Sequence, residues 1–550
     1  MKHKSIVSII ILLLFNCLCI QPGNAARILA IETFAGRSHW NFMSAVLRAM
    51  TDNGHNVTVF TPFLDGNREN YTEIDMSSIF PMKLDMSIKY LRETFSNQFT
   101  PLSFMLELGR LSCEILHKNE LLNDFLANKL LTDFDAIIIE PGRVSDCLSY
   151  VGAGSNLPVI YTIPIPVNTY TERMTYGEVH NPATVSTMLF HSAVPKTFVQ
   201  RLTNTLVFLY TSIIIRFQEF IIQSLDTKPY DLGTINPPSL VFMNTHFISD
   251  KPRPTPSNVV NVGGIHLKPP KKIPKDILDF IEDAPHGVIL FTFGSTTAMT
   301  SLPSSILTAF REALAELPQK VLLKYEGEME DKPKNVMTRK WFPQRDVLLH
   351  KNVKLFVSHG GISGLYEAVD AGVPVLGFPL FGDQYRNIDN LVEAGMAISM
   401  EIFSVTKENF LKNVLDLVNS KKYIKNAKIT SEIFKDRPMS PQKSVVYWAE
   451  YVIRHKGAPH LKSQALNLTW YQYFLLDIFA DLNVSLVVQN LDTTEDIDLL
   501  NQLIEFYSLV IDTLVALTEL KMFRNKLASQ NITLKSGFDA LLKCNEDVRG

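Results

Sequence analysis

The side chains best suited to bind and orient a substrate fall between Trp341 and Asn387. In chain order this stretch holds an aromatic residue, an amide, a His-Gly-Gly turn, a hydroxyl, a glutamate and an acid–amide pair: Trp341, Gln344, His359-Gly360-Gly361, Ser363, Glu367 and Asp383-Gln384. These groups match the parts of a nucleotide sugar, which are a flat base, a ribose, a diphosphate and a hydroxylated hexose. The stretch therefore predicts a nucleotide-sugar site.

The His359-Gly360-Gly361 turn is the expected diphosphate site. It ends the apolar run Leu355–Ser358 and precedes a helix that should begin near Ser363. Backbone N–H groups at a helix N-terminus favour an anion, and glycines let a phosphate approach the backbone. Ser363 could cap the helix or donate its hydroxyl to a phosphate oxygen. Gly294-Ser295, at the end of an earlier apolar run, offers a second cradle, although a ligand-free turn gives the same pattern.

The remaining residues suit the base, the ribose and the sugar. Trp341 offers a face for stacking a base and Gln344 an amide for its edge. Glu367 lies one helical turn beyond Ser363, where a carboxylate can accept ribose hydroxyls. Asp383-Gln384 sits on a loop and can bind hexose hydroxyls. Alone, each residue has an ordinary structural explanation, but their common order favours the nucleotide sugar.

Two α/β patterns must position these groups. Apolar strands alternate with helical stretches twice along the chain, which predicts two doubly wound parallel sheets of the α/β class facing one another across a cleft. Ligands of such sheets bind at the carboxyl ends of the strands. The expected strands are Arg27–Glu32, Val57–Phe60, Ala136–Ile139 and Val159–Tyr161, then Val288–Phe293, Lys320–Lys324, Leu355–Ser358 and Val373–Phe378, with helices at Trp40–Met50 and Ser304–Leu317.

Five segments follow from these patterns. Residues 1–25 read as a secretory signal peptide, with lysines before an apolar run and Gly-Asn-Ala at the cleavage site. Residues 26–250 form a first domain, 251–274 a Pro-rich linker, 275–465 a second domain, and 466–550 a helical tail. Within the tail, 493–527 reads as an amphipathic helix. The tail has no uninterrupted run of the ~20 apolar residues that a membrane span needs.

Location and assembly are less constrained by the sequence. The signal peptide predicts the secretory pathway, either in or on the endoplasmic reticulum or beyond it as a secreted protein. The apolar run Leu206–Ile215 is too short to span a bilayer and is read as a core helix or as a helix lying on a membrane face. Peripheral membrane contact and a homo-oligomer both stay open.

Composition excludes some functions. The net charge is −3, which does not indicate a nucleic-acid partner. Removing the signal leaves Cys113, Cys147 and Cys544, enough for one disulfide and one free thiol but without metal-site spacing. Asp133-Phe134-Asp135 resembles a metal-binding DxD, but it precedes a strand, the wrong end of a sheet for a ligand. Five glycosylation sequons begin at Asn56, Asn70, Asn467, Asn483 and Asn531.

The motifs together resemble the family 1 UDP-glycosyltransferases, most closely the animal UDP-glucuronosyl/UDP-glucosyltransferases and their insect branch. The resemblance runs from about Arg27 to Asp477 and includes Phe291–Ser295 and Arg454–Ala458. It implies a GT-B fold in which residues 26–250 bind the acceptor and residues 275–465 bind a UDP-sugar donor. It implies neither a metal nor a bound cofactor. It places uracil against Trp341 and Gln344, the ribose at Glu367, the diphosphate among Ser295, His359, Gly361 and Ser363, and the sugar at Asp383 and Gln384.

The catalytic base is expected in the first domain. His39 ends a Gly-Arg-Ser-His turn after the first strand, and a histidine suits proton removal near neutral pH. The resemblance gives His39 this role, with a carboxylate to orient it. Glu140 stands where the vertebrate pattern has Asp, and Asp146 is the alternative partner.

The expected activity is inverting transfer of a hexose to a small lipophilic acceptor. Glucose is favoured over glucuronate as the sugar. A UDP-sugar-binding protein without turnover and a GT-B epimerase or hydrolase are the alternatives.

Overall fold

The computed structural model describes residues 25–34, 36–79, 87–95, 100–127, 130–141, 149–152, 155–166, 168–169, 171–225, 228, 236–295 and 297–478. Several features expected from the sequence lie outside these residues. They are most of the signal peptide, the alternative partner Asp146, Cys147 and Cys544, the sequons at Asn483 and Asn531, and the helix expected over 493–527. The described part divides into two compact units, and the larger one, residues 1–215 and 234–463, holds both predicted sheets.

The first sheet has seven parallel strands in the order β3-β2-β1-β4-β5-β6-β7. Its central strands are continuous apolar runs, because a parallel sheet is covered by helices on both faces. The strands are β1 Arg27–Ile31, β2 Asn56–Thr61, β3 Tyr71–Asp75, β4 Ala136–Ile139, β5 Val159–Ile163, β6 Leu240–Met243 and β7 Val259–Asn261. β1 lies at the switch of strand order, between β2 and β4, where such sheets bind ligands.

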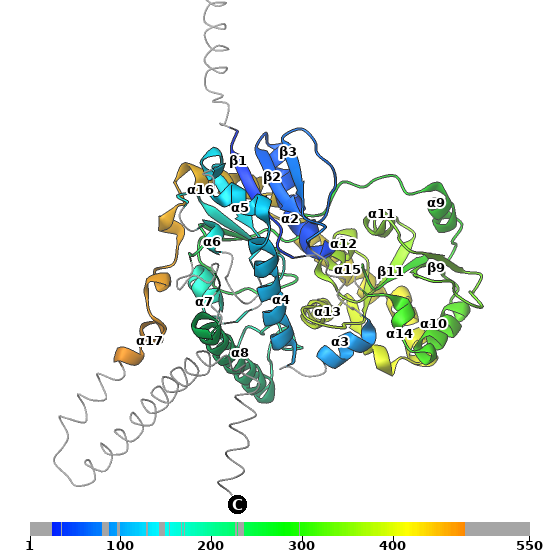
Figure 1. The fold of residues 1–550 in the computed structure, drawn as a ribbon. Helices are drawn as coiled ribbons and strands as arrows, with labels where there is room; N and C mark the ends of the chain where they lie inside the picture. The colour runs from blue at the N-terminus through cyan, green and yellow to red at the C-terminus, as the bar shows by residue number, and fades with distance from the viewer. Residues whose placement is uncertain are drawn as a thin grey trace, which may run out of the picture. The chain divides into compact units, whose positions relative to one another are not determined.

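The helices of this half lie in the connections from β1 to β2, β3 to β4, β4 to β5 and β5 to β6. α2 (Arg37–Asp52) lies beside the sheet (Figure 1). It buries Trp40, Phe42 and Val46 in the same core as the strands, which fixes the direction of its first turn. The others are α3 Ile88–Thr94, α4 Thr100–His117, α5 Glu120–Ala127, α6 Ser149–Gly152, α7 Thr171–Tyr176 and α8 Phe198–Leu225, with a 3-10 turn at Leu130–Asp133.

The second sheet has six parallel strands in the order β10-β9-β8-β11-β12-β13. The strands are β8 Val288–Thr292, β9 Lys320–Lys324, β10 Val336–Arg339, β11 Val353–Ser358, β12 Val375–Gly377 and β13 Ala397–Ser399. As in the first sheet, the predicted strands lie within a few residues of the observed ones. This sheet is therefore the second α/β half expected from the sequence.

Two apolar cores form on the two faces of the second sheet. Because side chains alternate along a strand, Phe291 points into one core and Leu290 into the other. α10 (Ser304–Glu316) and α14 (Lys407–Asn419) cover the first face (Figure 1). The opposite face is covered by α9 Lys275–Glu282, α11 Gln344–Leu348, α12 Ile362–Ala371, α13 Gln384–Glu393 and α15 Lys421–Lys435.

The chain returns to the first core after α15. α16 (Pro441–Arg454) buries Val445, Ala449 and Val452 in the same cluster as the side chains of α2 and β1. Glu450 on α16 accepts hydrogen bonds from Asn53 (3.1 Å) and His55 (3.2 Å). Sequence order assigned residues 275–465 to the second domain, but the apolar face of α16 is buried against the first.

The apolar run Leu206–Ile215 belongs to a longer helix than its composition indicated. α8 spans Phe198–Leu225, and its Phe198–Ile215 part is long and apolar enough, by length and composition, to cross a membrane. The run itself is ten residues, but the helix that contains it extends beyond the run at both ends. Of this 18-residue segment, 28% is buried.

The DxD sequence contacts the start of β1. The Asp135 carboxylate accepts the backbone N–H of Arg27 at 2.7 Å, and Asp133 pairs with the Arg27 guanidinium at 3.6 Å. These contacts lie at the amino ends of β1 and β4. No group of three or more His, Cys, Asp or Glu side chains in the described part of the chain could hold a metal ion.

The smaller unit contains residues 216–233 and 464–550. Of its C-terminal part, only residues 464–478 are described. They form a 3-10 turn at Gln464–Asn467 and the short helix α17 at Trp470–Tyr473, which begins with a capping box between Thr469 and Gln472. Cys113, in α4 of the larger unit, is disulfide-bonded.

Candidate active site

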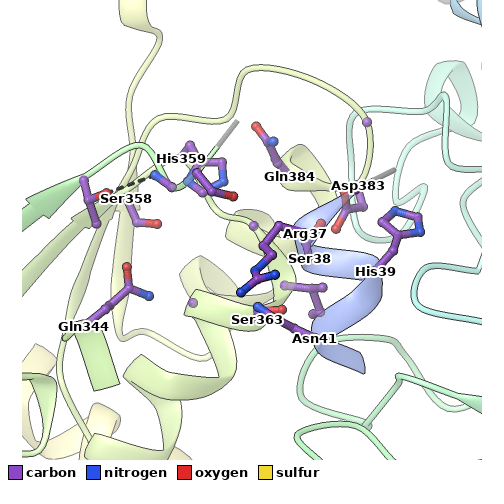
Figure 2. A pocket seen from close by; sticks show the side chains of 18 of the residues that line it. Arg37, Ser38, His39, Asn41, Gln344, Ser358, His359, Ser363, Asp383 and Gln384 are labelled. Carbon is purple, nitrogen blue, oxygen red and sulfur yellow. Dashed lines mark hydrogen bonds between the residues drawn. The ribbon is translucent and has the colours of Figure 1, made fainter. Parts of the chain in front are cut away.

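A cavity of about 820 Å³ opens at the carboxyl ends of strands from both sheets. Its size is ordinary for a small-molecule site. His39 lines the cavity together with every residue predicted to bind the donor: Ser295, Trp341, Gln344, His359, Gly361, Ser363, Glu367, Asp383 and Gln384. Figure 2 labels His39, Gln344, His359, Ser363, Asp383 and Gln384. The two α/β halves thus bring the predicted residues to one place.

His39 and Glu140 form a buried pair in the first half. His39 lies in the first turn of α2, after β1, and Glu140 directly follows β4, the neighbouring strand. Both residues are 2% exposed. Nδ1 of His39 is hydrogen-bonded to Oε1 of Glu140. With the Nδ1 proton donated to this carboxylate, Nε2 carries a lone pair that can accept a proton.

The loop between β1 and α2 holds the His39 ring in place. Phe34 packs against the ring with centroids 4.4 Å apart. Gly36 permits this approach, because a Cβ there would overlap the Phe34 ring. Gly36 is also the N-cap of α2, and its carbonyl accepts the N–H groups of His39 and Trp40, both at 3.0 Å. The local sequence therefore fixes the histidine before any substrate binds.

His359 lies between the two predicted phosphate cradles. A Cβ on Gly294 would lie 2.5 Å from the His359 ring, and one on Gly361 would lie 2.6 Å from it. A side chain at either glycine would collide with the His359 ring, so both positions need glycine whether or not a phosphate binds. Burial, reinforced by the charge of Lys324, lowers the pKa of His359 to about 4. Among the described residues its Nδ1 has no partner, so it could bond to a phosphate oxygen.

The start of α12 differs from the sequence prediction. Gly361 occupies the N-cap position and the helix begins at Ile362, so Ser363 is not the cap. Glycine is a common N-cap residue but offers no side-chain acceptor, so no side chain caps the first N–H groups of α12. Ser363 lies in the first turn and lines the cavity, where its hydroxyl remains suited to a phosphate.

Gln344 and Glu367 contact one another directly. Nε2 of Gln344 donates to Oε2 of Glu367 at 2.7 Å, which orients the carboxylate towards the cavity. Burial raises the pKa of Glu367 to about 7, although the Gln344 hydrogen bond opposes the shift. A carboxyl group with this pKa changes charge near neutrality. The sequence predicted both residues separately but did not indicate that they are bonded.

Asp383 and Gln384 present different hydrogen-bonding groups. Oε1 of Gln384 accepts the backbone N–H groups of Leu380 (2.9 Å) and Phe381 (3.2 Å), so its NH₂ group is left to donate to a ligand. Asp383 is 8% exposed, and its Oδ2 accepts from Asn387 at 2.5 Å. A hydrogen-bond donor beside an acceptor suits neighbouring sugar hydroxyls, because each hydroxyl can both donate and accept a hydrogen bond.

The structure also adds residues that the motifs did not indicate. The first half contributes an apolar wall to the cavity, drawn from α3, α4 and the loop before α8: Leu91, Phe95, Phe104, Met105, Leu108 and Met188. No motif marks these side chains, because α3 and α4 bury apolar residues on other faces as well. Arg37 and Lys324 also line the cavity. Of these added residues, Arg37 could have been predicted, because it lies in the same Gly-Arg-Ser-His turn as His39.

Two facing parallel sheets with a shared cavity are the arrangement of the GT-B fold. Solved structures agree in fold. The forosaminyltransferase SpnP has a TM-score of 0.51 at 14% identity and covers 78% of this chain and 99% of its own. Os79 from O. sativa, solved in complex with UDP, has a TM-score of 0.50 at 15% identity over 77% of this chain and all of its own.

The chain belongs to the UDP-glycosyltransferase family and is a transferase. The family profile described as "UDP-glucoronosyl and UDP-glucosyl transferase" matches residues 27–497. UDP-glucosyltransferase 2 of Dactylopius coccus is 40% identical over 87% of this chain and 93% of its own. Human UDP-glucuronosyltransferase 2B15 is 30% identical over 86% of this chain and 93% of its own. The resemblance identified from the motifs is thereby confirmed.

Proposed function

We propose that this transferase moves a hexose from a UDP-sugar to a hydroxyl group of a small lipophilic acceptor, with inversion at the anomeric carbon. The observation that carries the proposal is the common cavity. It contains a histidine bonded to a buried carboxylate, and it is lined by the full set of predicted donor-binding residues.

The reaction needs a base and a stabilised leaving group. Nε2 of His39 takes the proton of the acceptor hydroxyl as the oxygen attacks the anomeric carbon. The bond from that carbon to UDP breaks, and UDP leaves with the electron pair. Glu140 stabilises the imidazolium, while the N–H groups at the start of α12 and the ring of His359 face the diphosphate.

A lipophilic acceptor follows from the apolar wall that the first half contributes. These aromatic and aliphatic side chains can bury an apolar ring beside His39, leaving the hydroxyl within reach of Nε2. Acceptor affinity would then come mainly from surface area removed from water.

Glucose is the proposed sugar. A glucuronate carboxylate would favour a cation in the cavity that has no other acidic partner. Arg37, Lys324 and Arg345 line the cavity and already pair with Asp65, Glu326 and Asp370 respectively. The similarity to a protein named a glucosyltransferase also supports glucose.

UDP release from UDP-glucose in the presence of a panel of phenols tests the activity. Acceptor-dependent release should fall by at least about 100-fold in His39→Ala, because general base catalysis typically contributes that much. His286→Ala is the matched control, since His286 is exposed and does not line the cavity. UDP binding without acceptor-dependent release would indicate a binding protein, and release that needs no acceptor would indicate a hydrolase. A new UDP-sugar would indicate an epimerase.

Competition between UDP-glucose and UDP-glucuronate tests the choice of sugar. A preference for glucuronate would overturn it. Turnover should be unchanged by EDTA, since no step of the proposed reaction uses a metal ion; inhibition reversed by added Mg²⁺ would contradict this.

We also propose that the protein enters the secretory pathway, working in or on the endoplasmic reticulum or being secreted. The sequence of the N-terminal segment supports this. Among the sequons in described residues, Asn56, Asn70 and Asn467 are exposed. Endoglycosidase treatment of the expressed protein should lower its mass, and an unchanged mass together with a retained N-terminal segment would contradict the proposal.

A further inference from the structure

A second buried carboxyl group lies behind the His39–Glu140 pair. Glu32 directly follows β1 and is 0% exposed. A glutamate at the end of an otherwise apolar buried strand is costly unless its charge is neutralised or paired. No basic side chain is among the groups that act most strongly on it.

The strand register places Glu32 beside Glu140. β1 and β4 are parallel with Ile31 opposite Ile139, so Glu32 and Glu140 are the next residues in step. The N–H of Glu140 reaches the carbonyl of Ile31 at 3.4 Å. Glu140 is the side chain that acts most strongly on Glu32, through its charge and as a hydrogen-bond partner. Glu140 is therefore the titratable group next to Glu32, and His39 is bonded to Glu140 in turn.

The contacts of Glu32 require a proton. Oε1 accepts the backbone N–H of Phe34 at 3.1 Å, whereas Oε2 is buried with no donor among the described residues. An ionised carboxylate would leave Oε2 unsatisfied next to another negative charge. A protonated carboxyl group instead donates from this side to Glu140.

We propose that Glu32 is a protonated positioning residue that donates a hydrogen bond to Glu140 and thereby holds it, as an anion, against Nδ1 of His39. The proposal rests on His39 acting as the base of the proposed function. It extends the buried pair to a chain of three groups, Glu32 to Glu140 to His39. Glu32 also fixes Phe34, whose ring packs on His39.

The electrostatics of the site agree with this assignment. Burial, and after it the charge of Glu140, raises the pKa of Glu32 well above its usual value of 4.5. Two neighbouring carboxyl groups in one buried site share a proton in the same way at other active sites. Here the proton resides on the group farther from the histidine, so Glu140 keeps its charge for the imidazolium.

The test compares Glu32→Gln with Glu32→Leu. A Gln amide donates from the same position as a protonated carboxyl group, whereas Leu fills similar space without a donor. Glu32→Gln should keep kcat within about threefold of the wild type and leave the acid limb of the kcat/KM pH profile unmoved. Glu32→Leu should lower kcat about 10-fold, the usual cost of a lost hydrogen bond to a buried charge. Thr162→Val, which removes a buried hydroxyl bonded to the neighbouring β4 carbonyl, controls for packing.

The direction in which the acid limb of the kcat/KM pH profile moves distinguishes the proposed role from a purely structural one. Without the Glu32 proton, Glu140 is less stabilised as an anion and holds the imidazolium proton more tightly, so Glu32→Leu moves the limb to higher pH by about half a unit. If Glu32 were ionised, both substitutions would remove a negative charge and move the limb to lower pH. That result, or a Leu variant with wild-type kcat and profile, would overturn the proposal.

A readout that needs no turnover separates this proposal from the proposed function. The His39 ring can be titrated by NMR in histidine-labelled full-length protein, with its signal assigned from His39→Gln. A midpoint that is unchanged in Glu32→Gln and raised in Glu32→Leu supports the positioning role even if His39→Ala still turns over, which would refute only the base. A midpoint lowered by both substitutions, or moved by neither, refutes the role of Glu32.

Discussion

The two walls of the cavity are built in different ways. The donor wall comes almost entirely from one stretch, Trp341 to Gln384, in which successive loops leave the carboxyl ends of β10, β11 and β12. The first half's wall comes from separate segments, and its bonded pair, His39 and Glu140, is separated by 101 positions. Binding of the nucleotide is thus encoded locally, whereas the base and the acceptor surface exist only after the first sheet has formed.

The two walls also differ in polarity. The donor wall offers hydrogen-bonding groups with fixed partners, such as Gln344 with Glu367. The acceptor wall is mainly apolar apart from the turn that carries His39. A polar wall rejects a ligand that would leave the wall's donors and acceptors without partners. An apolar wall accepts many ligands of suitable size. The difference predicts strict donor selection and broad acceptor selection.

The largest expected effect comes from breaking the pair in the first half. Glu140→Gln should lower kcat on the order of 100-fold, because the amide neither balances the imidazolium nor enforces the Nδ1–H tautomer. The affinity for UDP-glucose, measured by calorimetry, should stay the same because Glu140 does not line the cavity. A weakened affinity with unchanged kcat would show that the two walls are not functionally separate.

Glu140→Asp sharpens this experiment. It keeps the charge but is one methylene shorter, so it should lie between the wild type and Glu140→Gln. Equal activities for the Asp and Gln variants would show that catalysis depends on the length of the side chain that contacts His39 and not on its charge.

The next largest effect is a pH dependence of donor binding. With a pKa of about 7, Glu367 loses its charge as the pH falls, and a neutral carboxyl group is a poorer acceptor for ribose hydroxyls. The affinity for UDP-glucose should therefore fall about 20-fold between about pH 7.5 and 5.5. UDP-glucose is the suitable ligand because its diphosphate does not titrate in this range.

The stability of the free protein should change in the opposite sense. The folded-state pKa of Glu367 is raised above its usual 4.5, so its contribution to stability is full below 4.5 and is lost as the pH rises through about 7. The increase in Tm on adding UDP-glucose should consequently grow with pH. Glu367→Gln is the control and should bind weakly at every pH; a steep dependence in that variant would contradict the assignment.

A smaller effect is expected from the exposed aromatic residue of the donor wall. Trp341→Ala should weaken UDP-glucose binding about 10-fold, the usual loss when one base loses its stacking partner. Tm should not change, because Trp341 is 65% exposed. Trp470→Ala, at a tryptophan 52% exposed outside the cavity, is the matched control. Equal calorimetric affinities for the two variants would remove Trp341 from the donor wall.

The smallest effect is expected on the apolar side. Phe104→Ala should raise the KM for a phenolic acceptor about fivefold through lost apolar contact, while the KM for UDP-glucose stays constant. Phe198→Ala on α8, 70% exposed and outside the cavity, is the control. Steady-state kinetics with each substrate varied in turn makes the measurement. A raised KM for the donor instead would show that the two walls are not divided between substrates.

Much of the fold was predictable because parallel strands carry a strong signal. β4 and β9 have the predicted bounds, and the other predicted strands differ by only a few residues, since buried strands read as short β-branched and aliphatic runs. The donor-wall residues could also be predicted, because each follows a strand whose carboxyl end must face the cleft. The length of α8 and the N-cap of α12 could not be predicted, because helix ends depend on contacts with neighbouring segments.

The sequence by itself determined the family, the paired α/β halves and the residues of the donor wall, because these depend on local periodicity and short spacings. Only the tertiary structure decided which carboxylates surround His39. Glu140 and Glu32 meet because β1 and β4 are neighbours in register, although more than one hundred positions separate them in the chain. The tertiary structure likewise placed α16 in the first core and gathered the acceptor wall, since burial and strand pairing join residues that no local pattern connects.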